Sequence, residues 1–260
     1  MLFSPLCSGS SGNASYLEAG GARLLIDAGL PASRITALLE DIDVEPKTLR
    51  GILVTHEHSD HVAGVGVLSR RFDLPIYATA GCWAHMRHTL GEIKPRNIRV
   101  IVPDQAFFME ELCILPFATP HDAAEPVGFV FEQNGHKLAL MTDIGHVSSH
   151  MLESIAGADL LLLESNHDVE MLRAGGYPYP LKMRILSANG HLSNEDAGLV
   201  LVKLYQSGLR NAIIGHLSRE NNHPDLALLT VLSVLAQAGI EDMRVDVALH
   251  DRPCGVFDLS

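Results

Sequence analysis

The 260-residue chain is poor in basic residues and in cysteine. Its 19 lysine and arginine residues face 31 acidic residues, so the formal net charge is −12. A protein that coats DNA through a broad basic surface is therefore excluded. The four cysteines, at positions 7, 82, 113 and 254, form no Cys-x-x-Cys pair. Their spacing excludes a zinc ribbon and a redox motif, and it favours reduced thiols in a cytoplasmic protein.

Long apolar runs and targeting signals are also missing. Runs such as Val62–Leu68 and Leu160–Leu163 fall far short of the ~20 residues needed to cross a bilayer. The N-terminus shows no basic segment followed by an apolar stretch and a cleavage site, so we expect a cytoplasmic protein without membrane contact. No linker, repeat or low-complexity tract divides the chain, and 47% of its residues are hydrophobic. We therefore expect one domain over residues 1–260.

Short runs rich in Val, Ile and Leu alternate with helical patterns along the chain. These runs predict strands at Ser15–Leu17, Ala22–Ile26, Gly51–Val54, Ile76–Ala78, Ile98–Val102, Leu112–Ala118, Gly128–Glu132, Lys137–Met141, Leu160–Leu163, Asn211–Ile214 and Val245–Leu249. The helical patterns predict helices at Pro31–Leu39, Val65–Phe72, Ala80–Leu90, Ser148–Ala156, Asn194–Gln206 and Pro224–Ala238. The dipeptide Asn134-Gly135 predicts a tight hairpin. Two sheets covered by helices fit this mixture, and a doubly wound parallel sheet would give the same periodicity.

Histidine is abundant, with 14 residues, and its densest group is His-Glu-His-Ser-Asp-His at positions 56–61. This group directly follows a predicted strand. Side chains two apart at a strand end point the same way, so His56 and His58 can converge on one ion. Asp60 and His61 lie in the turn before the next predicted helix and can reach a position beside that ion. Imidazole nitrogen and carboxylate oxygen suit Zn²⁺, Mn²⁺ or Fe²⁺.

The motif His-x-His-x-Asp-His after a strand resembles the signature of the metallo-β-lactamase-fold hydrolases. The resemblance implies an α/β fold, an αββα four-layer sandwich of two mixed sheets flanked by helices. It implies a supporting role for Asp27, in Ile26-Asp27-Ala28-Gly29. It also implies two divalent ions, Zn²⁺ or Mn²⁺ with Fe²⁺ as a third option. The implied ligands are His56, His58 and His121 for one ion, Asp60, His61 and His216 for the other, and Asp143 as the bridge.

Further segments resemble the nuclease-like branch of these hydrolases. The loop Ser-Gly-Ser-Ser-Gly-Asn at positions 8–13 is similar to the opening loop of ribonuclease Z and the phosphodiesterases near it, and Gly190-His191 resembles the segment of ribonuclease Z beside the scissile phosphate. Segments around Glu164, Tyr177 and Arg219 resemble the YycJ/WalJ type, whose members are regarded as DNA-processing nucleases, notably 5′ exonucleases. The substrate or supporting candidates are then Ser8, Ser10, Ser11, Asn13, Glu164 and His167. The length leaves no room for an inserted β-CASP domain or a long transfer-RNA-gripping arm.

The resemblance implies a nuclease, with DNA as its expected substrate, in which a hydroxide bridging the two ions attacks phosphorus in line. Asp60 would orient this nucleophile, and His191 would donate a proton or hydrogen bond to the phosphate or the leaving oxygen. Two divalent ions, two carboxylates and a hydroxide sum to a local charge of about +1, which attracts an anion within an acidic protein. Additional phosphate contacts are expected from Lys182, Arg184, Arg219 and Arg252. Because basic residues are few, we expect modest affinity and a shallow salt dependence.

Other activities stay open at this point. The sequence scarcely separates a nuclease from a small-molecule cyclic phosphodiesterase. Thioester or lactone hydrolases share the histidine motif, but the Ser-Gly loop and Gly190-His191 argue against them. A non-catalytic metal-binding scaffold would need neither a second ion nor His191. The di-iron redox relatives carry Glu where this chain has His58. Native metal, strand polarity, DNA against RNA and oligomeric state are not determined by the sequence.

Overall fold

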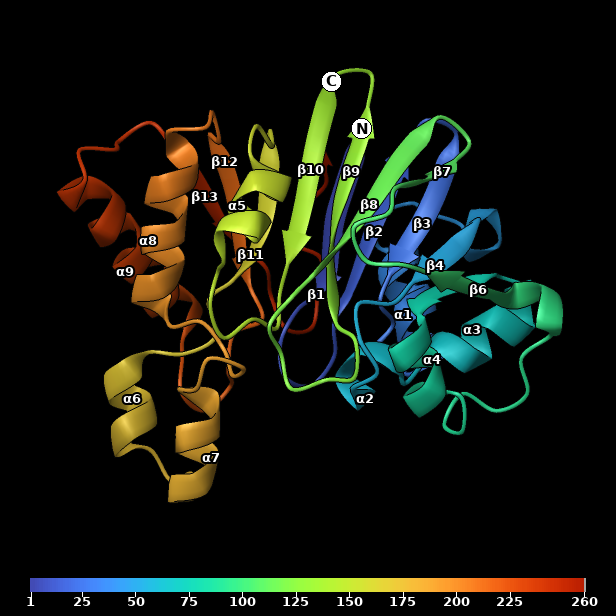
Figure 1. Ribbon diagram of the computed structural model, residues 1–260, viewed down its shortest axis with the longest axis horizontal. Coiled ribbons are helices and arrows are strands. Elements are labelled where there is room, and N and C mark those ends of the chain that lie inside the picture. Colours follow the sequence, from blue (N-terminus) through green and yellow to red (C-terminus); the bar gives the residue numbers. More distant parts are fainter. Residues whose placement is uncertain (260) are drawn as a thin grey trace.

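The computed structural model describes residues 1–259, and it contains two seven-stranded sheets (Figure 1). The first sheet runs in the order β14 (Phe257–Asp258), β1 (Leu2–Cys7), β2 (Ala14–Ala19), β3 (Ala22–Ile26), β4 (Gly51–Leu53), β5 (Ile76–Thr79) and β6 (Ile98–Ile101). The second runs β13 (Arg244–Val247), β12 (Asn211–Gly215), β11 (Leu160–Glu164), β10 (His136–Met141), β9 (Val127–Gln133), β8 (Leu112–Ala118) and β7 (Phe107–Met109). Both are mixed, because β3 to β6 and β10 to β13 pair in parallel and the remaining strands pair antiparallel.

Helices cover the outer face of each sheet (Figure 1). Beside the first sheet lie α1 (Ala32–Glu40), α2 (Ser59–Val62), α3 (Val65–Phe72) and α4 (Ala80–Met86), with short 3₁₀ turns at Pro46–Thr48 and Pro95–Asn97. Beside the second lie α5 (Ser149–Ile155), α8 (Asn194–Tyr205) and α9 (Pro224–Gln237). A further pair, α6 (Val169–Ala174) and α7 (Tyr179–Ile185), projects from this body. Among residues 1–259, no helix is long and apolar enough to cross a membrane.

Three layers of buried apolar side chains hold the four layers of secondary structure together. One layer lies between the sheets and joins Leu24 of β3 to Phe129 of β9. The other two lie between each sheet and its helices, with Ile35 of α1 in one and Val231 of α9 in the other. The arrangement is the αββα sandwich that the resemblance implies, and a single doubly wound sheet is excluded.

Most predicted elements are present, with ends that agree within two residues. The exception is α4, which ends at Met86 rather than Leu90. The chain turns there because the backbone of Leu90 packs against Gly66 of α3 and its carbonyl accepts a hydrogen bond from Arg70. The predicted hairpin is confirmed, since Asn134 and Gly135 both have positive φ, as a type I′ turn requires. Elements that the sequence did not predict are β1, β7, β14, α2, α6 and α7.

Candidate metal centre

Segments from both sheets meet at one edge of the sandwich, because the strands that carry them all end there. Asp27 directly follows β3, Asp143 follows β10 by two residues, and His216 directly follows β12. All three have left-handed backbone conformations, with φ between 55° and 58°. Such conformations are rare for residues other than glycine, and they often occur at functional sites. Here they turn the chain sharply at the strand ends, where the polar side chains converge.

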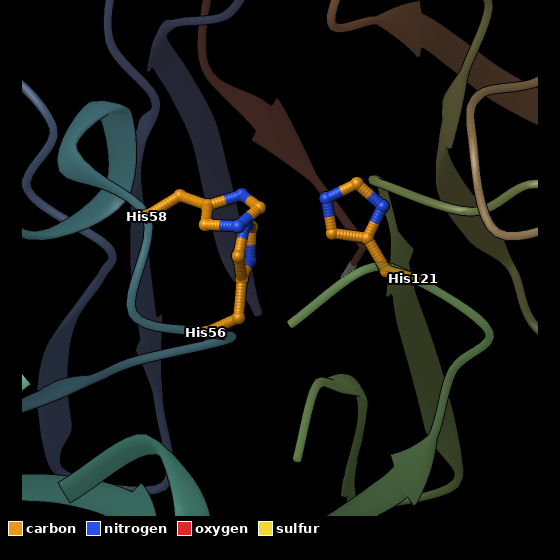
Figure 2. A group of neighbouring side chains, drawn as sticks. All are labelled: His56, His58 and His121. Atoms are coloured by element: carbon orange, nitrogen blue, oxygen red, sulfur yellow. The ribbon is translucent and has the colours of Figure 1, made fainter. Parts of the chain in front are cut away.

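The histidine motif and its distant partners form compact groups of donor atoms. His56, His58 and His121 each offer one nitrogen, and these atoms lie within 4.8 Å of one another. Figure 2 shows His56 and His58, from the segment before α2, facing His121 from the loop after β8. A second group with the same spacing contains Asp60, His61 and His216. Asp60 and His61 belong to the short helix α2, not to an open turn as the sequence predicted.

Asp143 lies between the two groups. Its Oδ2 is 3.2 Å from His61 Nε2, and its Oδ1 is 3.7 Å from His121 Nε2. His56 Nε2 and Asp143 Oδ2 are buried and have no hydrogen-bond partner among the described residues. Burial holds the pKa of His56 well below its usual value, so this ring is neutral and keeps a free lone pair.

These orphaned atoms test whether the residues fit a metal ion. Buried polar atoms without a partner are rare, and an ion would supply the missing partner for both. Neutral imidazoles together with carboxylates form the donor set that divalent transition metals prefer. The site therefore fits divalent metal binding.

Asp27 fixes the orientation of His61. Its Oδ2 lies 2.8 Å from His61 Nδ1 and also accepts a hydrogen bond from the Thr55 hydroxyl at 2.8 Å. Its Oδ1 accepts the backbone N–H of Thr55 at the same distance. With Nδ1 engaged by Asp27, the Nε2 atom of His61 faces the centre, which is how a carboxylate orients a metal-binding histidine. Thr55 was not predicted, because a threonine at the end of a strand carries no signal of its own.

Glu164, the last residue of β11, joins two histidines in one buried network. Its Oε1 lies 2.7 Å from His191 Nδ1 and 3.1 Å from His216 Nδ1. Its Oε2 accepts the backbone N–H groups of Ile144 at 2.9 Å and Leu192 at 3.2 Å. Burial raises the pKa of Glu164, but the two histidines outweigh burial and lower the pKa to about 2. Glu164 is therefore an anion that orients both rings.

His191 is held as a donor at the rim of the centre. Burial lowers its pKa, but the Glu164 carboxylate outweighs burial, and the net pKa is raised above the usual histidine value. The ring lies 5.2 Å from that of His121 and 5.3 Å from that of His216, centroid to centroid. An imidazole whose pKa is raised in this way can give a hydrogen bond or a proton to a group bound beside the metal donors.

The opening loop approaches the centre, but its members differ in their contacts. Asn13 Nδ2 lies 3.0 Å from His61 Nε2, so Asn13 is at the donor cluster itself. The Ser8 hydroxyl accepts the backbone N–H of His216 at 2.8 Å. Ser10 and Ser11 face outward, and Ser11 Oγ accepts a hydrogen bond from Arg219 Nε at 3.1 Å.

His167 is buried near Glu164 and His191 but offers no ligand to the centre. Its ring belongs to none of the donor groups formed by residues 1–259, and neither of its nitrogens has a hydrogen-bond partner there. Burial lowers its pKa to about 4, so the ring is neutral. The structure thus brings Glu164 to the centre and leaves His167, three residues further along the chain, outside the donor groups.

A pocket of about 200 Å³ opens beside His191, and we call it the His191 pocket. Its lining residues are Ser10, Asp122, Asn166, Tyr177, Leu181, Arg184, Ile185, Gly190, His191 and Ser218. Of the four basic residues expected at phosphates, only Arg184 lines it, and Arg184 is paired with Asp122. Lys182 instead donates to the backbone carbonyls of Arg173 and Gly175.

Comparison with known proteins agrees with the fold and the donor groups described above. Residues 22–216 match the family model described as the beta-lactamase superfamily domain. The chain is 43% identical to exodeoxyribonuclease YycJ of Bacillus anthracis, over 91% of this chain and 90% of that protein. It is 41% identical to exodeoxyribonuclease WalJ of Streptococcus pneumoniae, over 96% and 93%. The metallo-beta-lactamase fold protein YhfI of Bacillus subtilis shares the fold, with a TM-score of 0.73 and 18% identity over 99% of this chain and all of that chain.

Proposed function

The chain belongs to the beta-lactamase superfamily, and within it we propose that the protein is a metal-dependent exodeoxyribonuclease. One observation supports this activity above the others. The His191 ring, held by Glu164 through Nδ1, adjoins the donor cluster and also lines the His191 pocket, where a phosphodiester bound at the cluster would have its leaving oxygen. The high identity to two curated exodeoxyribonucleases over nearly their whole length supports the same conclusion.

The proposal assigns the donors to two divalent ions, Zn²⁺ or Mn²⁺. His56, His58 and His121 would hold one ion, Asp60, His61 and His216 the other, and Asp143 would contact both. When bound, such ions supply positive charge that lowers the pKa of water and stabilises the added negative charge on phosphorus. Asp27 would keep the ring of His61 in place through Nδ1, which leaves Nε2 for the ion.

Two side chains would carry the proton movements. The Asp60 carboxylate would accept a hydrogen bond from the attacking water and so orient its oxygen toward phosphorus. As this oxygen bonds to phosphorus, the water gives up a proton to the Asp60 carboxylate, the bond from phosphorus to the leaving oxygen breaks, and His191 gives the leaving oxygen its proton. A positioned acid of this kind contributes about 10²–10⁴ in rate. Glu164 would stabilise the protonated ring before transfer and hold it in position.

The proposal also places the protein in the cytoplasm. Its contacts with DNA would be confined to the nucleotides at the metal centre. With a net charge of −12 and one lining arginine already paired with Asp122, the protein offers few groups to phosphates far from the centre. We expect modest affinity for duplex flanks and a shallow dependence of binding on salt. A salt slope that reflects roughly eight or more neutralised phosphates would contradict this part of the proposal.

A nuclease assay tests the activity. Protein loaded with Zn²⁺ or Mn²⁺ is incubated with 5′- and 3′-labelled single and double strands, with a cyclic phosphodiester, with bis-p-nitrophenyl phosphate and with a thioester. We expect DNA to be shortened from an end, and His191→Ala and Asp60→Asn to lower turnover by about 10²–10⁴ at saturating metal.

The matched control is His88→Ala, an exposed histidine beyond α4 that belongs to no donor group formed by residues 1–259. This variant should keep wild-type turnover. Near-normal turnover of both site variants would overturn the assignment of residues. Cleavage of the thioester or of the cyclic diester alone, with no shortening of DNA, would overturn the proposed activity.

A further inference from the structure

The helix pair α6–α7 forms one wall of the His191 pocket. Tyr177, Leu181, Arg184 and Ile185 line the pocket from α7 and the turn before it. Figure 1 shows this pair extending from the body of the sandwich, apart from the helices that cover the sheets. A strand lying over the donor cluster and continuing past His191 would therefore meet α7.

The two helices of this wall are joined to each other, and Arg184 of α7 pairs with Asp122 in the loop after β8. Lys182 Nζ donates to the carbonyls of Arg173 at 2.6 Å and Gly175 at 2.7 Å, which ties α7 to the end of α6. Ile185 is buried, and a Cβ at Gly190 would overlap the carbonyl oxygen of Ile185, so the segment after α7 packs closely on itself. The wall is thus part of the folded structure and not a free arm.

The groups inside the pocket suit a nucleotide. The Ser218 hydroxyl accepts hydrogen bonds from the N–H groups of Asn221 at 3.2 and 3.4 Å, and among residues 1–259 it donates to no acceptor, so its proton is free for a ligand. Ser10 and His191 add further donors around the same space, and Arg184 lines it while paired with Asp122. Donors of this kind bind phosphate and sugar oxygens.

Tyr177 offers a flat surface for a base. It is half-buried against the pocket, and its hydroxyl makes no hydrogen bond with any residue that the structure describes. Aromatic side chains bind bases by stacking, and this contact tolerates any base because every base has a π-face. Leu181 and Ile185 extend the apolar side of the pocket.

Resting on the proposed function, we infer that the His191 pocket receives the terminal nucleotide of the strand, with its base against Tyr177, and that the α6–α7 wall stops a continuous strand from passing the centre. The volume of about 200 Å³ is below the roughly 300 Å³ at which sites for drug-sized ligands begin, so the pocket has room for no more than one end unit, part of which would remain outside it. The wall thereby explains why a strand end is required.

Three variants and two DNA forms test this inference. Tyr177→Ala removes the ring, Tyr177→Phe keeps it, and Tyr179→Ala is the matched control, because Tyr179 is 74% exposed and does not line the pocket. For each variant we compare kcat/KM on an end-labelled linear duplex with the rate on bis-p-nitrophenyl phosphate, which has no base. Thermal unfolding of each variant verifies folding.

We expect Tyr177→Ala to lower the ratio of the two rates about tenfold or more, Tyr177→Phe to restore it, and Tyr179→Ala to leave it unchanged. Wild-type protein should cut linear duplex and spare a covalently closed circle. If Tyr177→Ala behaves like Tyr179→Ala while wild-type protein shortens linear duplex from its ends, this inference is wrong and the exonuclease proposal stands. If closed circles are cut as fast as linear ends, the requirement for a strand end is wrong, and both proposals fail. If wild-type protein cuts no DNA at all, both proposals fail together.

Discussion

Glu164 shows how much one buried carboxylate can organise. Each of its oxygens takes part in two contacts, one oxygen with the rings of His191 and His216 and the other with backbone N–H groups. An anion with every lone pair engaged is held rigidly, because any movement would leave a buried charge without partners. Glu164 thereby links a proposed metal-binding ring to the proposed proton donor.

Glu164→Gln should separate these contacts. The amide oxygen can still accept, but the amide nitrogen cannot accept the second pair of hydrogen bonds, and the negative charge that raises the pKa of His191 is lost. We expect kcat on DNA and metal affinity each to fall about 10–100-fold. The acidic group in the pH profile of kcat, which we assign to His191, should titrate at lower pH.

The profile distinguishes positioning from simple destabilisation, which would leave the pKa in place. Glu132→Gln, a substitution at a 53% exposed carboxylate on β9, is the control. A Glu164→Gln protein with wild-type metal content and pH profile would contradict the role of Glu164.

The protonation of His61 and His216 predicts how metal uptake depends on pH. Burial lowers the pKa of each ring, but Asp143 and the other nearby carboxylates outweigh burial, raising the pKa of His61 well above the usual value and that of His216 to about 10. Below these pKa values both rings of the metal-free protein carry an extra proton, which metal binding must displace.

Metal affinity should therefore rise as pH increases through neutrality, with release of about one proton per ring. Calorimetric titration of metal-free protein with Zn²⁺ in buffers of different ionisation enthalpy measures the proton count. Affinity that is constant between pH 6 and 8, with no proton released, would show that the rings are already neutral.

At the scale of elements, the sequence predicts the helices and strands that are long or that are bounded by a distinct turn signal. The strand ends that carry His56 and His216 and the Asn134-Gly135 hairpin could be predicted because periodicity and turn chemistry are local properties. The elements that escaped prediction are short or interrupted: β1 contains Pro5 and an irregular register beside it, and α2 has four residues. The His191 pocket was also beyond prediction, since segments distant in the chain line it.

The loop that follows β3 packs so closely against α2 that there is no room for one added methyl group. A Cβ at Gly29 would overlap the carbonyl oxygen of Asp60 and would lie 2.7 Å from the backbone nitrogen of Asn13. Gly29→Ala must therefore push α2 away from β3 and displace Asp60 and His61. We expect a loss of about 1–3 kcal/mol in the free energy of unfolding, together with loss of bound metal.

Gly176→Ala is the matched control, because no atom lies within 4 Å of a Cβ built there. Denaturant titration gives the stability of both variants, and elemental analysis gives their metal content. Full metal occupancy in Gly29→Ala would show that α2 accommodates the methyl group without moving the ligands.

At the scale of the whole molecule, the two sheets are joined twice. Apolar side chains fill the space between them, and the donor groups combine residues that follow strands of the first sheet with His121, Asp143 and His216, which follow strands of the second. Because both halves share one core and one centre, we expect them to unfold together, as the proposed single domain requires.

Heating should therefore give one transition, and bound metal should raise its midpoint. A metal concentration about 1,000 times Kd adds ~4 kcal/mol, which corresponds to roughly 10 °C for a chain of this size. A chelator should remove that shift, and His121→Ala should lose most of it while His88→Ala keeps it. Two separate transitions in calorimetry, or a midpoint unaffected by chelator, would contradict this expectation.

Because the metal-donor residues lie far apart in the sequence, they are synthesised at different times. His61 and His216 share one donor group, and they are 155 residues apart in the sequence. At about 5–20 residues per second, a ribosome needs roughly 8–30 s to add the second after the first. A nascent chain thus carries the histidine motif long before its last partner exists, and any hydrolytic activity of the centre is withheld until the final strands of the second sheet have emerged.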